Sequence, residues 1–467
     1  MSTIESVNPA TEAVLARFDT HSNADVEAAL AQADAAFRRS REMTIAERAT
    51  PMRVLGQLLR DRRERYAGLI TAEMGKPITE ALAELEKCAL TCDYYAEHAA
   101  TYLADEHVAT NASESFVAFE PLGVILAVMP WNYPFWQVVR FLAPALMAGN
   151  AVVLKHASNV PQCAVALEEA VRDAGFPAGS LRTLLLSGAA VEPIVADERI
   201  RAITLTGSTA TGSRLAELAG RAVKKAVLEL GGSDPFIVLR DADLVGAAAT
   251  ATKARYQNTG QSCIAAKRFL VEAPVAREFE RLFADAIRAL RVGDPLDPKT
   301  QVGPLARADL RDALEEQVAT SVRMGARVVV GGRRREGTGW FYEPTLLADV
   351  TEDMPVLTDE TFGPVAALLA VRDADEAVRV ANSSPYGLGA ALWTRNEASA
   401  KAIARRIESG SVFINGMVAS DPRLPFGGVK RSGYGRELSG YGIREFVNIQ
   451  TIWMGPATSV PPVANAE

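Results

Sequence analysis

Short, continuous runs of apolar residues alternate with longer amphipathic stretches through most of the chain. Five such runs lie between residues 121 and 230, separated by segments of helical length and composition, at 123–129, 151–155, 182–186, 202–207 and 225–230. Continuous apolar strands separated by helices are typical of a parallel sheet with both faces covered. The pattern predicts a Rossmann-like, doubly wound region, in which ligands bind at the carboxyl ends of the strands.

A second α/β series follows this region, with apolar runs at 235–239, from Lys267 onward and at 326–332. The chain has no Ser/Gly-rich linker and no repeat of fixed period, which favours two α/β lobes packed together. The first hundred residues have helical periodicity instead, with Asn23 as the candidate N-cap of the first helix.

The composition is that of a globular protein: of the 467 residues, 48% are hydrophobic and 23% charged. The net charge of −7 and the lack of a long basic block argue against nucleic acid or an anionic membrane as the main partner. The N-terminus does not resemble a secretory signal, and the most apolar stretch, 122–131, is about half a membrane span. We therefore expect a cytoplasmic protein.

The four cysteines, Cys88, Cys92, Cys163 and Cys263, are too few to hold a chain of this size together as disulfides. Cys88 and Cys92 lie one helical turn apart and could share a metal ion. However, the four histidines are scattered and no second pair has ligand spacing. We interpret the pair as small buried hydrophobes and expect no metal site.

The common nucleotide-binding motifs are absent from the sequence. The segment 207–212 has the two glycines of a P-loop, but Ser213 and Arg214 replace its lysine and hydroxyl residue. What remains is a glycine turn between a strand and a helix, whose N–H groups could receive a phosphate. A plain strand-to-helix connection is an equally good interpretation.

Cys263 lies in a polar segment of small residues, 258–263, unlike the helical settings of the other cysteines. Such a cysteine is a candidate nucleophile, although a buried hydrophobe is the alternative. No histidine follows His156, so a carboxylate would have to act as the base. Glu229 ends an apolar run, where burial should raise its pKa; pairing with a neighbouring lysine is the alternative.

Five motifs occur in the order seen in aldehyde dehydrogenases: PWNYP at 130–134, LELGG at 228–232, GQSC at 260–263, ETFGP at 360–364 and PFGGVK at 425–430. The chain resembles that family over nearly its whole length. Within the family, segments 258–268, 415–438 and 444–453 are most similar to the shorter bacterial succinate-semialdehyde dehydrogenases.

The resemblance implies an α/β fold with a Rossmann-like cofactor lobe, an α/β catalytic lobe and a small β extension for oligomerisation. The implied domains are cofactor-binding, 1–105 and 121–230 with 427–443 returning to it; catalytic, 231–426; and oligomerising, 106–120 and 444–456. Relatives assemble through such an extension, so a homodimer or homotetramer is expected. The β-prone residues of 115–120 are compatible with an exposed strand.

By the same resemblance, Cys263 attacks the aldehyde as a thiolate and forms a thiohemiacetal. The Asn132 amide and the Cys263 backbone N–H would stabilise the oxyanion. Hydride transfer to nicotinamide then leaves a thioester, and Glu229 would activate the water that hydrolyses it. Glu437 matches a second glutamate that relays protons. In isolation, Asn132 reads as a turn residue and Glu437 as a surface residue.

The resemblance also implies a cofactor set: Trp131, Lys155, Ser158, Gly207, Ser208, Glu360 and Phe362. Many relatives have glutamate, which binds the adenosine ribose, where this chain has Ser158. A carboxylate would repel a 2′-phosphate, whereas Ser158 can donate to one beside Lys155. We therefore predict NADP as the preferred cofactor, with NAD possible. The alternative is that Ser158 caps the helix entering at Pro161.

Arg140 and Ser420 match residues that bind the remote carboxylate of succinate semialdehyde in relatives. A second arginine of longer members is Gln257 here, and Arg423 could compensate. The sequence thus predicts oxidation of succinate semialdehyde to succinate. The alternatives are a dehydrogenase for glutarate semialdehyde or broadly for aliphatic aldehydes, and a non-catalytic family member. Together, Asn132, Glu229 and Cys263 argue against the last.

Overall fold

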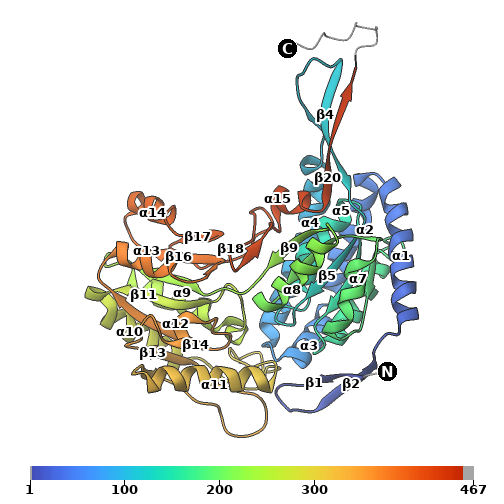
Figure 1. The fold of residues 1–467 in the computed structure, drawn as a ribbon. Helices are drawn as coiled ribbons and strands as arrows, with labels where there is room; N and C mark the ends of the chain where they lie inside the picture. Colours follow the sequence, from blue (N-terminus) through green and yellow to red (C-terminus); the bar gives the residue numbers. More distant parts are fainter. Residues whose placement is uncertain (1–2, 456–467) are drawn as a thin grey trace.

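Two α/β lobes and a projecting arm make up the computed structural model, which describes residues 3–455 (Figure 1). Residues 1, 2 and 456, which fall within the expected domain boundaries, lie outside the described residues. Across residues 3–455, no helix has the length and apolar character needed to span a membrane.

The first lobe is built on a six-stranded sheet of order β19-β9-β8-β5-β6-β7. Its five mutually parallel strands coincide with the five predicted apolar runs: β5 (Val124–Met129), β6 (Ala151–His156), β7 (Leu181–Thr183), β8 (Ile200–Thr206) and β9 (Lys225–Glu229). The predicted parallel sheet is confirmed. The short β19 (Gly433–Tyr434) returns from near the C-terminus and pairs antiparallel with β9.

Helices cover both faces of this sheet because alternate strand residues enter different apolar clusters. Leu126 and Val153 pack in the cluster that contains α1 (Asn23–Glu42), whereas Ile125 and Val152 face the cluster of α2 to α5. The bounds of the remaining helices of this lobe are α2 (Ile45–Asp61), α3 (Arg63–Met74), α4 (Ile78–Tyr102), α5 (Trp136–Met147), α6 (Pro161–Asp173), η1 (Gly188–Val191), α7 (Glu192–Ala196) and α8 (Thr209–Arg221).

The chain start differs from the prediction in two ways. A hairpin of β1 (Thr3–Val7) and β2 (Val14–Asp19) precedes the helices. Ser22, not Asn23, is the N-cap of α1: its hydroxyl accepts from the Asp25 N–H at 3.3 Å, and the Asp25 carboxylate accepts from the Ser22 N–H at 2.8 Å. This reciprocal capping box places Asn23 inside the first turn.

The second lobe holds a seven-stranded sheet of order β12-β13-β14-β11-β10-β16-β17, parallel except at its β12 edge. The strands are β10 (Asp234–Val238), β11 (Ala266–Glu272), β12 (Arg327–Val330), β13 (Thr345–Ala348), β14 (Val365–Val371), β16 (Gly389–Trp393) and β17 (Ser411–Ile414). The helices are α9 (Leu244–Tyr256), η2 (Gln257–Gly260), α10 (Ala273–Arg288), α11 (Ala308–Arg323), α12 (Pro355–Thr358), α13 (Ala374–Asn382) and α14 (Glu397–Ala404). A two-stranded ribbon of β15 (Tyr386–Gly387) and β18 (Val429–Lys430) lies beside them.

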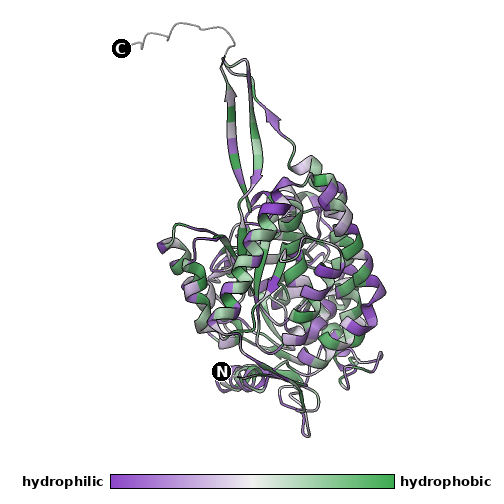
Figure 2. Ribbon diagram, turned by 90° about the vertical axis from the view of Figure 1, so that its right-hand side faces the viewer, coloured by the Kyte–Doolittle hydropathy of each residue, from purple (hydrophilic) through white to green (hydrophobic). Residues whose placement is uncertain are grey.

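The arm is a three-stranded antiparallel sheet of order β20-β4-β3 that stands away from both lobes (Figures 1 and 2). It consists of β3 (Glu106–His107), β4 (Glu114–Pro121) and β20 (Val447–Met454), which follows the short helix α15 (Ser439–Arg444). The strand predicted at 115–120 is confirmed as part of β4. The assignment of the arm to oligomerisation stays a prediction.

The lobes meet where the first sheet ends. The segments that follow β5, β8 and β9 line a cavity together with residues that precede β11 and β14 of the second lobe. Ligand binding at the carboxyl ends of parallel strands is the general rule for such sheets. This boundary therefore contains the candidate site.

Candidate active site

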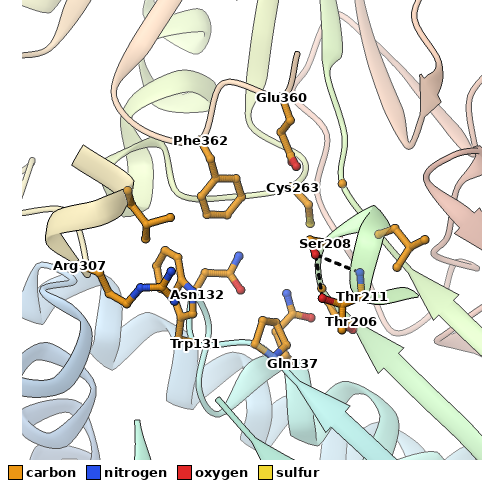
Figure 3. A pocket seen from close by; sticks show the side chains of 15 residues that line it. Trp131, Asn132, Gln137, Thr206, Ser208, Thr211, Cys263, Arg307, Glu360 and Phe362 are labelled. Atoms are coloured by element: carbon orange, nitrogen blue, oxygen red, sulfur yellow. Dashed lines mark hydrogen bonds between the residues drawn. The ribbon is translucent and has the colours of Figure 1, made fainter. Parts of the chain in front are cut away.

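Two cavities meet at Cys263. The first, of about 480 Å³, extends toward α8 and contains Glu360. The second, of about 490 Å³, lies between α4, α5 and the loop that carries Ser420. Among the described residues, Cys263 and Gln137 line both cavities. Figure 3 shows the Cys263 side chain in the first cavity, between Glu360 and Asn132. A thiol at such a junction can reach ligands on either side.

The loop before Cys263 has an unusual backbone. Asn258, Thr259 and Gly260 have φ values of 54°, 55° and 71° in succession. Left-handed conformations of non-glycine residues cost free energy and persist at sites where the surroundings impose them. Gly260 has a second requirement, because a Cβ there would lie 2.3 Å from the carbonyl oxygen of Gly363. The polar, small-residue composition of this segment follows from these constraints.

Hydrogen bonds from both lobes fix this loop. The Asn258 backbone N–H donates to Glu80 at 2.6 Å, and its side-chain amide donates to the Asn132 carbonyl at 2.8 Å. The Lys267 ammonium donates to the Cys263 carbonyl at 2.7 Å. The candidate nucleophile is thus held in place by hydrogen bonds, which is what preorganised catalysis requires.

Cys263 differs from the other cysteines in exposure. Cys88, Cys92 and Cys163 are fully buried, as predicted for small hydrophobes, whereas Cys263 is half-buried and opens onto both cavities. Burial raises the pKa of the Cys263 thiol to about 11, against the opposing effect of the positive charges of Arg140 and Lys267. The residue therefore needs a proton acceptor to become a thiolate at neutral pH.

Two N–H donors are available beside the thiol. Asn132 is 4% exposed and directs one N–H to the Gln261 carbonyl at 3.1 Å, which leaves its second N–H. The backbone N–H of Cys263 has no acceptor among the described residues. Asn132 is therefore more than a turn residue, and the pair has the composition of an oxyanion hole.

Glu229, Glu437 and Arg140 form a buried cluster. Each is 2–3% exposed, and Arg140 forms an ion pair with Glu437. Both carboxylate oxygens of Glu229 lack a hydrogen-bond partner among the described residues. Burial, and next the negative charge of Glu437, raises the pKa of Glu229 well above its usual value, while Arg140 opposes this shift. A shift of this kind is typical of functional carboxyl groups.

The alternatives for these acids are wrong. Lys224 donates to the Val195 carbonyl at 2.7 Å and Lys225 pairs with Glu445, so neither neighbouring lysine binds Glu229. Glu437 is buried and not a surface residue.

Glu229 lines neither of the two cavities in the described structure. Its carboxylate lies against Gly427, where a Cβ would come within 2.7 Å of the Glu229 Oε1 atom. The sequence predicts Glu229 as the base. In the described structure, the charges that act on its carboxyl group include those of Glu437 and Arg140.

The first cavity contains most of the predicted cofactor residues, including Trp131, Gly207, Ser208, Glu360 and Phe362. The Trp131 and Phe362 rings meet edge-on, with centroids 5.7 Å apart, at one side of the cavity (Figure 3). On the other side, Ser208 is the N-cap of α8 and accepts from the Thr211 N–H at 3.3 Å. Free N–H groups at this helix N-terminus suit a phosphate.

The Glu360 carboxylate accepts from the Gly232 N–H at 2.9 Å and lies 3.7 Å from the Lys267 Nζ atom. Burial raises the pKa of Glu360, and Lys267 opposes the shift. Gly231 lies close to this carboxylate, since a Cβ there would be 2.5 Å from the Glu360 Oε2 atom. These contacts hold Glu360 at the cavity wall as an acceptor for hydroxyl groups.

Lys155 and Ser158 do not line this cavity among the described residues. Lys155 is the last residue but one of β6 and is half-buried, and burial lowers its pKa. Ser158 lies exposed in the following turn, and the N-cap of α6 is Val160, with no side-chain cap. The interpretation of Ser158 as a helix cap is therefore wrong, and its hydroxyl has no hydrogen bond to another described residue.

On the second side of Cys263, the cavity is lined by Arg140 and Ser420, the predicted substrate-binding residues, and by Gln257, which replaces the second arginine of longer members. Binding of the substrate by Arg140 and Ser420 stays a prediction. Arg423 does not contribute to it. Its guanidinium pairs with Asp421, and its side chain is 73% exposed. Arg423 therefore does not replace the missing second arginine.

Sequence reasoning missed several residues that line the cavities. Gln137, Trp136 and Lys87 were not singled out. Gln137 and Trp136 begin the helix after the PWNYP motif, and helical spacing back from Arg140 points to both. Lys87 is one of many charged residues on a long helix, so no sequence signal separates it from a surface lysine.

The whole chain is similar to known proteins. Residues 1–452 match the model of the aldehyde dehydrogenase family. A probable succinate-semialdehyde dehydrogenase (NADP+) of Synechocystis sp. is 52% identical over 451 residues, 97% of this chain and 99% of that protein. A succinate-semialdehyde dehydrogenase (NADP+) of Mycobacterium tuberculosis is 50% identical over 454 residues, 97% of this chain and 99% of that protein.

A solved structure has the same fold. The succinic semialdehyde dehydrogenase of Streptococcus pyogenes in complex with NADP+ superposes with a TM-score of 0.95 and is 39% identical, covering 97% of this chain and 100% of that chain. The likeness covers both lobes and the cavities between them. The described residues contain a cysteine at the junction of two cavities and a buried glutamate without a hydrogen-bond partner, and the family match extends over residues 1–452. This chain therefore belongs to the aldehyde dehydrogenase family.

Proposed function

We propose that this chain oxidises succinate semialdehyde to succinate with NADP+ through a covalent intermediate on Cys263. The observation that carries the proposal is the position of Cys263, which opens on one side to the cavity with Ser208 and Glu360 and on the other to a cavity with cationic side chains. The similar proteins named as NADP+-dependent succinate-semialdehyde dehydrogenases support the same reaction.

The first step is addition of the Cys263 thiolate to the aldehyde carbon. The carbonyl oxygen becomes an oxyanion, which the second amide N–H of Asn132 and the backbone N–H of Cys263 would receive. Losing one such donor typically costs about a hundredfold to a thousandfold in rate. The positive charges of Arg140 and Lys267 favour the thiolate that starts the step.

The residues of the first cavity fit a dinucleotide. Bound NADP+ supplies the acceptor for the hydride that leaves the thiohemiacetal carbon. Glu360 would accept from ribose hydroxyls, Trp131 and Phe362 would contact the nicotinamide half, and the α8 N-terminus with Gly207 and Ser208 would face the pyrophosphate.

The exposed turn after β6 would select between the two dinucleotides. Ser158, with its unoccupied hydroxyl, and Lys155 would receive the 2′-phosphate, whereas a carboxylate at position 158 would repel it.

Hydrolysis of the thioester requires a base. We assign this role to Glu229, which would rotate from Glu437 toward Cys263 and take a proton from water. The attacking oxygen then bonds to the acyl carbon, and the sulfur leaves as the thiolate. When Glu229 returns to the buried cluster, the Glu437 carboxylate would receive its proton, and Arg140 would remain the positive charge beside the two acids.

The second cavity would determine substrate specificity, because its residues Arg140 and Ser420 would bind the distal carboxylate of the aldehyde. Glutarate semialdehyde, longer by one methylene group, is the competing substrate. An uncharged aldehyde would leave the cationic groups of this cavity unpaired, at a cost in binding.

We assign the domains as the sequence predicts, with cofactor binding in 1–105, 121–230 and 427–443, catalysis in 231–426 and assembly through 106–120 and 444–456. The arm supports a homodimer or homotetramer, because several of its apolar side chains are exposed: Val108, Ile449, Ile452, Trp453 and Met454. A free thiol nucleophile suits a reducing compartment, so we place the enzyme in the cytoplasm.

Steady-state kinetics tests this function. Purified protein should reduce NADP+ with succinate semialdehyde at a higher kcat/KM than with glutarate semialdehyde or butanal. Cys263→Ala should lose at least about a thousandfold in kcat because the covalent step is removed. Cys163→Ala, at a buried cysteine that lines neither cavity, is the matched control for turnover.

The cofactor assignment is tested in the same assay. Ser158→Glu should shift the kcat/KM ratio of NADP+ to NAD+ toward NAD+ by at least about tenfold, since it places a carboxylate beside the 2′-phosphate. Turnover in Cys263→Ala would refute the nucleophile. A wild-type preference for butanal would refute the proposed substrate, and an unchanged cofactor ratio would refute the role of Ser158.

A further inference from the structure

Lys87 projects from α4 to the wall of the second cavity, where it is half-buried. Its ammonium forms no ion pair with any described residue. By contrast, Lys76, which lies just before the start of α4, forms an ion pair with Glu84. An ammonium that is partly desolvated without a counter-ion is unfavourable unless a ligand supplies one.

The contacts of Lys87 direct its charge into the cavity. The Lys87 Nζ atom donates to the Ser420 Oγ atom at 2.6 Å and lies 4.2 Å from the centroid of the Trp136 ring. The aromatic face partly stabilises the cation. Because Ser420 accepts from Lys87, its own hydroxyl proton is free to be donated. Lys87 and Ser420 together thus present N–H and O–H donors to one point.

The other cations near this cavity are less available. Arg140 is ion-paired with Glu437 and stacks over the Phe426 ring at 4.6 Å. A carboxylate approaching Arg140 therefore also meets the charge of Glu437. The position of the family's second arginine is the neutral Gln257, and Arg423 lies outside the cavity. Lys253 also lines the cavity without an ion pair, but it is exposed. Among the cations that line this cavity in the described structure, Lys87 is the one that is partly buried and has no carboxylate partner.

We propose that Lys87 binds the distal carboxylate of the substrate together with Ser420, and so determines the preference for ω-oxo carboxylates over uncharged aldehydes. The inference rests on the proposed function, because it identifies which side chain supplies the missing charge. It makes α4, from the first lobe, part of the substrate site. Arg140 then serves both the carboxylate and the buried acids.

The groups around Lys87 make its binding of a carboxylate dependent on pH. Burial lowers the pKa of Lys87 to about 8, with the positive charge of Arg140 acting in the same direction and Cys88, Glu84 and Asp421 opposing. Lys87 is charged below this pKa and neutral above it. Recognition of a carboxylate should therefore weaken as the pH rises through about 8, whereas an uncharged aldehyde should be unaffected at this site.

The experiment compares succinate semialdehyde with butanal, which has the same chain length and no carboxylate. Lys87→Met keeps the apolar stem against Trp136 and removes the charge. It should lower kcat/KM for succinate semialdehyde about tenfold to a hundredfold, mainly through KM, and leave butanal within about twofold. Lys401→Met removes an exposed lysine of α14 and is the control for net charge.

Lys87→Arg provides the rescue and the pH test. Arginine stays protonated, so this variant should keep the preference and lose its decline above pH 8. The ratio of kcat/KM values for the two aldehydes cancels effects of pH on Cys263, which are common to both.

Three outcomes would overturn the inference. Equal losses for both aldehydes in Lys87→Met would show a structural role, and an unchanged preference would show that Lys87 does not bind the carboxylate. A pH-independent ratio in the wild-type enzyme would also contradict it. A wild-type enzyme without any preference for succinate semialdehyde would instead overturn the proposed function, and the inference with it.

Discussion

Burial raises the pKa of Cys263, at the junction of the two cavities, to about 11, and it also raises the pKa of Glu229 in the neighbouring buried cluster. For the thiol, this disfavours the reactive thiolate, so neighbouring charges have to compensate. For the carboxyl group, a raised pKa makes the carboxylate a stronger base once it has lost its proton. Arg140 is the charge that acts on both groups, and it lowers the pKa of each.

Replacing Glu437 with glutamine should lower the pH at which Glu229 begins to act as a base in acyl-enzyme hydrolysis. The negative charge of Glu437 raises the pKa of Glu229, and Glu437 also occupies Arg140. Without that charge, the Glu229 pKa falls and the basic form is present at lower pH. The measurement is the pH profile of acyl-enzyme hydrolysis, followed with an activated ester in the absence of cofactor.

Glu397→Gln, an exposed glutamate at the start of α14, is the control for this profile and should leave it unchanged. The rate of acyl-enzyme hydrolysis should rise with pH as the base loses its proton. If this rise occurs at the same or at higher pH in Glu437→Gln, Glu229 is not the base whose titration the profile reports.

At the scale of elements, the loop before the nucleophile shows how local backbone geometry positions chemistry. Its three successive positive-φ residues turn the chain sharply between α9 and β11. The resulting bend directs Cys263 back between the lobes. Arg255, fully buried, donates to the carbonyls of Thr361 and Gly363 and so ties this loop to the segment that carries Glu360.

Gly260→Ala should disrupt this loop. The added Cβ would lie 2.3 Å from the Gly363 carbonyl oxygen, at a φ of 71° that L-residues disfavour. We expect a loss of about 1–3 kcal/mol in the free energy of unfolding, with a larger proportional loss in kcat because Cys263 shifts. Chemical denaturation and steady-state kinetics measure the two effects.

Gly175→Ala is the control that separates backbone strain at positive φ from a steric clash of the added Cβ atom. Gly175 has a φ of 92°, but a Cβ there would meet nothing within 4 Å. This variant should lose about 1–2 kcal/mol of stability and keep its kcat. Full activity in Gly260→Ala would mean that the loop geometry is not needed for catalysis.

For the whole molecule, the arm is notable because a single chain leaves an edge strand and several apolar side chains of the arm exposed. β20 is an edge strand of its sheet, and Ile449 and Trp453 on it are 62% and 51% exposed. An exposed edge with apolar side chains is a surface for pairing with another chain. Figure 2 shows hydrophobic positions along both long strands of the arm.

The double variant Ile449→Asp, Trp453→Asp should lower the oligomeric state, because two charges would be buried in the interface. Light scattering coupled to size exclusion should report a mass reduced by about half or more. Val245→Asp, at a residue of α9 that is 67% exposed, is the control for adding a charge. An unchanged mass in the arm variant would show that assembly uses another surface.

Continuous apolar runs predicted the five parallel strands of the first sheet, and β10, β11 and β12 of the second. The strands β13, β14, β16 and β17 of the second sheet were not predicted. The hairpin of β1 and β2 was missed because most of its residues are exposed and carry no such signal. The N-cap of α1 was misplaced by one residue, since Ser22 and Asn23 are both good caps and only the capping box with Asp25 distinguishes them.

The sequence alone determined the family resemblance and singled out Cys263, Asn132 and Glu229 as candidate site residues, because these depend on local motifs. Only the tertiary structure decided where the charges are. It paired Arg140 with Glu437, left the Glu229 carboxylate without a hydrogen-bond partner among the described residues, removed Arg423 from the site and brought Lys87 to Ser420, 333 positions along the chain. Residue types fix which groups can ionise, but the strength and direction of their interactions depend on distance and burial, which exist only after the chain has folded.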